Sequence, residues 1–96
     1  MPAIRSGGEV VKILVHGKAY DFRYSRGLRN DGHCDSPESP RKKIRVKSGL
    51  PDPYRLEVII HELLHASLWQ GDEEWVDTTA HDIAEVLAKL GYRRAE

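Results

Sequence analysis

The sequence predicts an α+β fold with about three β-strands followed by two C-terminal helices. Before residue 48, apolar and polar residues alternate in short segments, which is typical of strands. After residue 48, apolar residues recur at helical spacing, which is typical of amphipathic helices. With 96 residues, 40% of them hydrophobic and 31% charged, the chain is expected to form one globular domain.

We expect this domain to span residues 9–92, with a flexible N-terminus over residues 1–8 and a short tail over residues 93–96. Basic and acidic residues balance at 15 each, so the composition supports neither a nucleic-acid nor a membrane partner. The chain has one cysteine, no leader-like apolar segment and no apolar run of membrane-spanning length. These features predict a cytoplasmic protein.

Two alternating segments, residues 9–15 and residues 19–25, predict a β-hairpin joined by a tight turn at residues 16–18. Residues 26–41 are rich in Gly, Asn, Asp, Ser and Pro, and they predict an irregular connection. Residues 43–47, KIRVK, alternate apolar and basic side chains. They predict a strand at the edge of the sheet, because Lys and Arg there discourage pairing with another chain.

Two helices are predicted after this strand. Asp52 followed by Pro53 is a favourable N-cap and first-turn pair for the first helix. Residues 70–72, Gln-Gly-Asp, interrupt the apolar pattern, and a second helix is expected over about residues 73–90. Gly91 is expected to end that helix.

The first predicted helix carries three ionisable residues, His61, Glu62 and His65, although its other positions are largely apolar. Histidines four residues apart project from one face of a helix, at a separation that suits two ligands of one metal ion. Glu62 points off the metal axis, where it can take a proton from a metal-bound water. This His-Glu-x-x-His pattern predicts a Zn²⁺ site with Glu62 as the catalytic base.

Over about residues 43–92 the chain resembles the zincin metallopeptidases, and in particular the very small stand-alone members of bacteria and phages called minigluzincin or SprT-like. The resemblance implies a zincin-like fold, in which a small antiparallel β-sheet of about three strands packs on the two helices, and it implies hydrolysis of peptide bonds. It also implies that an edge strand binds the substrate by β-addition, a place that residues 43–47 match.

A catalytic zinc site commonly has three protein ligands and one open position. Helical geometry places Glu73 on the buried side of the second helix, and Glu74 and His81 at or beyond its edge. The gluzincin resemblance implies a glutamate ligand followed four residues later by an acid that orients a ligand histidine. Glu73 and Asp77 match that spacing, so we predict Glu73 as the third ligand. Glu74, Asp77 and His81 are the alternatives.

Two further roles stay open. Cys34 is a redox or latency ligand or an ordinary loop thiol, and the absence of a partner cysteine at metal spacing favours the thiol. The side chain that would polarise the substrate carbonyl is sought among His33, Tyr20, Tyr24, Tyr54 and Tyr92.

Together these residues predict a zinc metallopeptidase acting on a peptide or protein substrate. The alternative is a zinc-stabilised binding or regulatory module without catalysis. Glu62 favours the enzyme, because a structural zinc site needs no base and is usually closed by four protein ligands. The sequence fixes neither the substrate nor the oligomeric state.

Overall fold

The computed structural model describes residues 9–93. Its elements, in chain order, are β1 (Val11–Val15), β2 (Lys18–Ser25), β3 (Gly32–Cys34), β4 (Lys43–Lys47), α1 (Tyr54–Ser67) and α2 (Glu73–Lys89). The predicted α+β class is confirmed. Residues 1–8, and residues 94–96 of the expected tail, lie outside the described residues.

The sheet has four strands in the order β1-β2-β4-β3 and is mixed, so the prediction of about three antiparallel strands is wrong. β1 pairs with β2 and β3 with β4 in antiparallel fashion, whereas β2 and β4 run parallel, with Phe22 opposite Ile44. The cause is β3, which lies inside residues 26–41. Because the chain reverses once before β3 and once after it, β4 returns in the direction of β2.

The prediction that residues 43–47 form an edge strand is also wrong, because β4 lies between β2 and β3. Its basic side chains make contacts with neighbouring segments. Arg45 donates a hydrogen bond of 2.8 Å to the backbone oxygen of Asp21, and Lys47 lies 3.5 Å from a carboxylate oxygen of Asp31. The strand that forms the outer edge on this side is β3.

The predicted hairpin is confirmed. β1 and β2 pair with Ile13 opposite Tyr20, and His16 and Gly17 form the turn with φ of 49° and 73°. Positive φ at both turn residues is the requirement of the tight turns that match strand twist.

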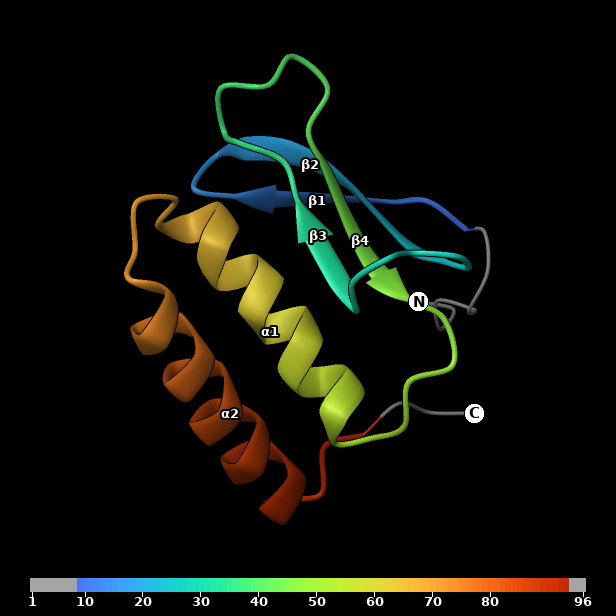
Figure 1. The fold of residues 1–96 in the computed structure, drawn as a ribbon, viewed down its shortest axis with the longest axis vertical. Helices are drawn as coiled ribbons and strands as arrows, with labels where there is room; N and C mark the ends of the chain where they lie inside the picture. The colour runs from blue at the N-terminus through green and yellow to red at the C-terminus, as the bar shows by residue number, and fades with distance from the viewer. Residues whose placement is uncertain (1–8, 94–96) are drawn as a thin grey trace.

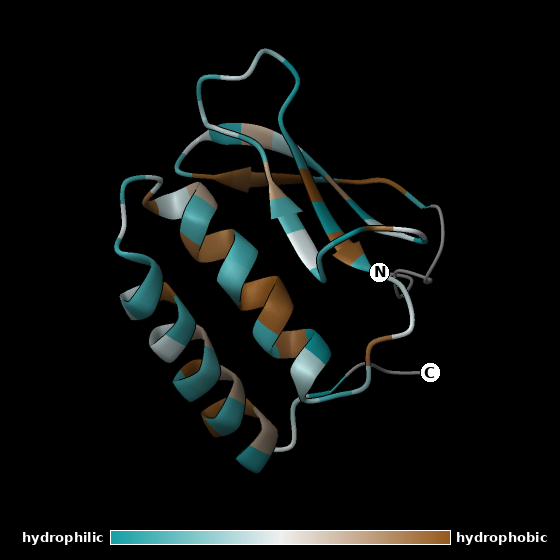
Figure 2. Cartoon of the chain, in the orientation of Figure 1, coloured by the Kyte–Doolittle hydropathy of each residue, from teal (hydrophilic) through white to brown (hydrophobic). Residues whose placement is uncertain are grey.

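Helix α1 lies between the sheet and α2 (Figure 1). Within the described residues, α2 packs on α1 and on no strand. Hydrophobic and hydrophilic bands alternate along both helices (Figure 2), which fits helices that each have one buried face. None of the helices in residues 9–93 is long and apolar enough to cross a membrane. The main core joins β2, β3, β4 and α1 through Tyr20, Phe22, Tyr24, Cys34, Ile44, Val46, Val58 and Ala66.

The ends of α2 follow the sequence signals, whereas those of α1 do not. At α1 the N-cap is Pro53, and Asp52 instead accepts a hydrogen bond of 2.8 Å from the Arg55 guanidinium. At α2 the side chain of Asp72 accepts from the Trp75 amide, as expected for an N-cap. Gly91, with φ of 92°, ends this helix as predicted.

Candidate metal centre

The two motif histidines lie one turn apart on α1. Their Nε2 atoms are 3.0 Å apart and their ring centroids 4.7 Å apart. Both side chains are largely shielded, with exposed fractions of 22% for His61 and 17% for His65. Two imidazole nitrogens therefore converge on one point at the side of α1.

Helix α2 returns antiparallel to α1 and places Glu73 at the same point. One carboxylate oxygen of Glu73 lies 3.3 Å from Nε2 of His61, and the other lies 3.3 Å from Nε2 of His65. All three donor groups lie within 4.8 Å of one another. Across residues 9–93 this is the one group of three His, Cys, Asp or Glu side chains that could hold a metal ion.

The spacing of these donors fits zinc. Ligands about 2.0–2.1 Å from a tetrahedral zinc ion are separated from one another by about 3.3–3.4 Å. The observed separations are 3.0, 3.3 and 3.3 Å. Two imidazoles and one carboxylate are also a donor set that catalytic zinc sites use.

Asp77 lies where an orienting carboxylate should be. Its Oδ1 is 3.0 Å from Nδ1 of His61, the ring nitrogen opposite the one that faces Glu73. A carboxylate in this position fixes which nitrogen carries the proton and turns the other toward a metal. Asp77 thus contacts the candidate ligand His61 at the ring nitrogen that does not face the other donors.

The alternatives for the third ligand lie elsewhere. His81 Nδ1 is 2.9 Å from Glu57 Oε1, farther along the two helices, and this hydrogen bond raises the pKa of His81. Glu74 is exposed and does not line the cleft at the histidines. One part of the reasoning for Glu73 is wrong, however. Its side chain is 65% exposed, because it reaches the histidines from the rim of the helix pair.

Glu62 is buried, with an exposed fraction of 7%. Burial raises its pKa above the ordinary value, although the neighbouring His61, His65 and His33 act in the opposite direction. A carboxylate whose proton affinity is raised in this way is suited to accept a proton during a reaction.

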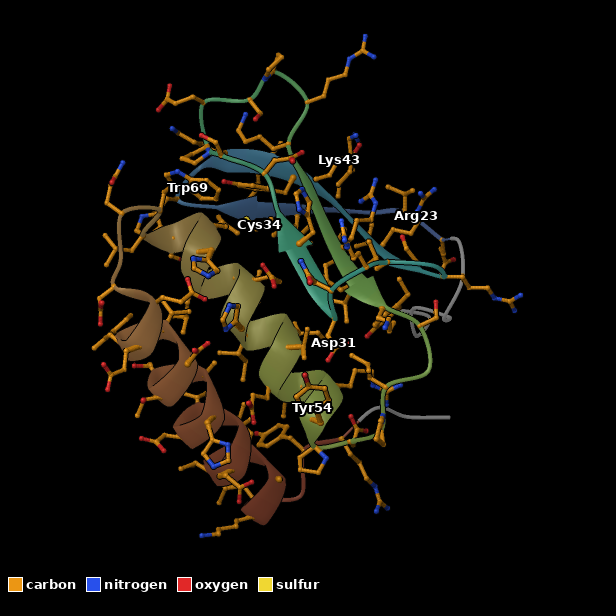
Figure 3. The ribbon with its side chains drawn as sticks, in the orientation of Figure 1. Arg23, Asp31, Cys34, Lys43, Tyr54 and Trp69 are labelled. Atoms are coloured by element: carbon orange, nitrogen blue, oxygen red, sulfur yellow. The ribbon has the colours of Figure 1, made fainter. Side chains whose placement is uncertain are left out.

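A cleft of about 740 Å³ runs along α1, with β3 on one side and the start of α2 on the other. Trp69 lies at one end, and Tyr54 and Asp31 lie at the other (Figure 3). Tyr54 donates a hydrogen bond to the Asp31 carboxylate, which raises the pKa of Tyr54 to about 12. The three candidate metal ligands and Glu62 also line this cleft.

The cleft narrows the search for a carbonyl-polarising side chain. Tyr20 and Tyr24 lie in the core, with exposed fractions of 1% and 5%, so neither can contact a substrate carbonyl. Tyr92 is 64% exposed and does not line the cleft. His33 and Tyr54 do line it. His33 lies on β3, and its Nε2 is 2.7 Å from the Asp35 carboxylate.

Cys34 is a core residue of β3 and not a loop residue, with an exposed fraction of 8%. Burial raises the pKa of its thiol to about 12, and the charges of Glu62 and Asp35 add to this effect. At pH 8 such a thiol holds about 10³-fold less thiolate than a thiol with pKa near 9. It is also absent from the group of metal donors.

We therefore expect Cys34 to be chemically inert in the folded protein. Labelling with a chromogenic disulfide reagent at pH 8 should be at least about 100-fold slower than in the unfolded chain, because thiolate is the reactive form. Labelling at equal rates in the folded and unfolded protein would contradict this placement.

Sequence reasoning missed the contribution of β3. This strand supplies Gly32, His33 and Cys34 to one wall of the cleft. Three residues within a Gly-, Ser- and Pro-rich stretch are too few to show an alternation of apolar and polar side chains.

Comparison with known protein families, curated proteins and solved structures gives no match.

Proposed function

We propose that the protein is a zinc-dependent metallopeptidase with a zincin-like arrangement. The observation that carries the proposal is the convergence of His61, His65 and Glu73 in a cleft that also holds Glu62. Three protein donors leave one coordination position of a tetrahedral ion open. A purely structural site, the alternative function, would be closed by a fourth protein ligand.

Zinc bound by these donors would lower the pKa of a coordinated water from about 15.7 toward 7. Glu62 is the acceptor for the proton of the attacking water, and its carboxylate then carries that proton to the leaving amine. Asp77 would orient His61 through the contact with its Nδ1, and Glu73, which faces Nε2 of both histidines, would supply the third ligand.

The outer edge of β3 supplies the backbone groups for an extended substrate. The Lys47 amide donates to the Asp31 carbonyl and the Asp35 amide to the Lys43 carbonyl, with His33 opposite Arg45 between them. In an antiparallel ladder this alternation directs the amides and carbonyls of Gly32 and Cys34 away from β4. A peptide can add to β3 there by backbone hydrogen bonds.

Two cleft residues, His33 and Tyr54, are candidates for the side chain that polarises the substrate carbonyl. His33 lies between Gly32 and Cys34, which face α1, so its side chain leaves β3 on the opposite face, where it is hydrogen-bonded to Asp35. Tyr54, the other candidate in the cleft, already donates its hydroxyl proton to Asp31.

The direct test is cleavage of a randomised decapeptide library, followed by mass spectrometry. The zinc-loaded protein is expected to cleave it, the chelated protein to leave it intact, and zinc re-addition to restore cleavage, since metal binding and activity are linked. Zinc binding without cleavage of the library or of an unfolded protein would instead support the non-catalytic module. Cleavage that persists in the chelated protein would also contradict the proposal.

A further inference from the structure

Gly32, on the edge strand β3, lies beside the proposed base. A Cβ built on Gly32 would lie 2.4 Å from Oε2 of Glu62, 2.9 Å from its Cγ and 2.9 Å from Cγ1 of Val58. Real Cβ atoms essentially never approach a heavy atom closer than 3.0 Å. Gly32 is not among the glycines with positive φ, so backbone conformation does not explain this glycine. The missing side chain does.

We propose that Gly32 is a positioning residue that sets the place of the Glu62 carboxylate by leaving it room against β3. This inference rests on the proposed role of Glu62 as the base. Gly32 would then fix the position of the base relative to the substrate-binding edge. It contributes backbone groups to that edge, and its lack of a side chain leaves room for the Glu62 carboxylate.

A methyl group at residue 32 would displace the Glu62 carboxylate most, because its Oε2 is the nearest atom, while Glu62 Cγ and Val58 Cγ1, each at 2.9 Å, would shift by less. The strand is held to β4 by hydrogen bonds of 2.7 and 3.0 Å on either side of residue 32. Val58 is 7% exposed and packed in the core. The carboxylate is the end of a flexible side chain. It would have to move by about 1 Å, the difference between 2.4 Å and the 3.4 Å of ordinary contact.

Gly32→Ala is therefore expected to act on catalysis and to leave the metal in place. A displacement of about 1 Å at a reacting group lowers kcat by about 10- to 100-fold. KM for a peptide that the wild type cleaves should change little, because a methyl group leaves the backbone groups of β3 in place. Zinc content should stay at one ion per chain, since the three atoms nearest to a Cβ at residue 32 belong to Glu62 and Val58 and not to the three donors.

A second substitution separates positioning from simple damage to the strand. Val58→Ala removes Cγ1, one of the atoms that crowd residue 32. Added to Gly32→Ala, it should raise kcat again by at least about tenfold, because the pair is coupled through shared space. Two independently harmful changes would instead lower kcat further. Val58→Ala alone is the matched control, and it is expected to lower the melting temperature while keeping kcat.

Crystal structures of the zinc-loaded wild type and Gly32→Ala provide a readout besides activity. The Glu62 carboxylate should be displaced in the variant, and the three metal ligands should superpose. A wild-type kcat, a loss of zinc, an unmoved carboxylate or a double variant slower than Gly32→Ala would each overturn the inference. A wild type that cleaves no peptide refutes the proposed function instead, and the two structures still decide whether residue 32 sets the place of Glu62.

Discussion

Replacing Glu62 by glutamine is expected to lower kcat by about 10²–10⁴-fold, the contribution of a positioned general base. The amide has nearly the same size as the carboxylate but cannot accept the proton. Zinc should stay bound at one ion per chain, because Glu62 is not one of the three converging donors. Steady-state rates on a peptide cleaved by the wild type, with elemental analysis of the same samples, measure both quantities.

The metal-free Glu62→Gln variant should also be at least as stable as the metal-free wild type at pH 7. Burial raises the pKa of Glu62, so the ionised carboxylate disfavours the folded state above that pKa, and this penalty disappears as the pH falls through it. A neutral amide carries no such penalty. Glu57→Gln, on the same helix, is the control for loss of a cleft carboxylate, and it should keep kcat. Hydrolysis by Glu62→Gln at the wild-type rate would exclude Glu62 as the base.

Replacing Glu73 by alanine is expected to weaken zinc binding by more than about 100-fold, the upper end of the range for residues that only orient a ligand. Asp77→Asn should weaken it by about 10-fold, the lower end of the range for partners that orient a ligand. Glu73 contacts both imidazoles at 3.3 Å, whereas Asp77 contacts only the far nitrogen of His61. Glu73→Ala therefore removes a metal donor, whereas Asp77→Asn only weakens the contact that orients His61.

Competition titrations with a chromogenic chelator measure these affinities. Glu74→Ala is the matched control, since it removes the neighbouring carboxylate in the same first turn of α2, and it should bind zinc like the wild type. His81→Ala should do the same, because His81 pairs with Glu57. If Glu74→Ala or His81→Ala lost the metal while Glu73→Ala kept it, the assignment of the third ligand would be wrong.

Local sequence signals predicted much of the fold. The hairpin, the Asp72 N-cap and the Gly91 terminus depend on nearest neighbours, and the structure confirms them. The spacing of His61 and His65 places both on one helix face by helical geometry alone. The position of Glu73 beside them required only that the short turn before Asp72 return the chain antiparallel.

The remaining features depend on contacts between distant segments. β3 forms because Gly32, His33 and Cys34 find a partner in β4, and their own residue types give no strand signal. That pairing moves β4 from the edge into the sheet and makes β2 and β4 parallel. The need for a glycine at position 32 arises from Glu62 and Val58, about 30 residues away in the chain, and no local pattern encodes it.

A crystal structure of the zinc-loaded protein, with anomalous diffraction recorded at the zinc edge, tests the central claim most directly. We expect one ion about 2.0–2.1 Å from Nε2 of His61 and of His65, and about 2.0–2.2 Å from an oxygen of Glu73. The fourth position should hold solvent on the side of Glu62. An ion bound elsewhere, a fourth protein ligand closing the site, or no ion after loading with zinc would contradict the account.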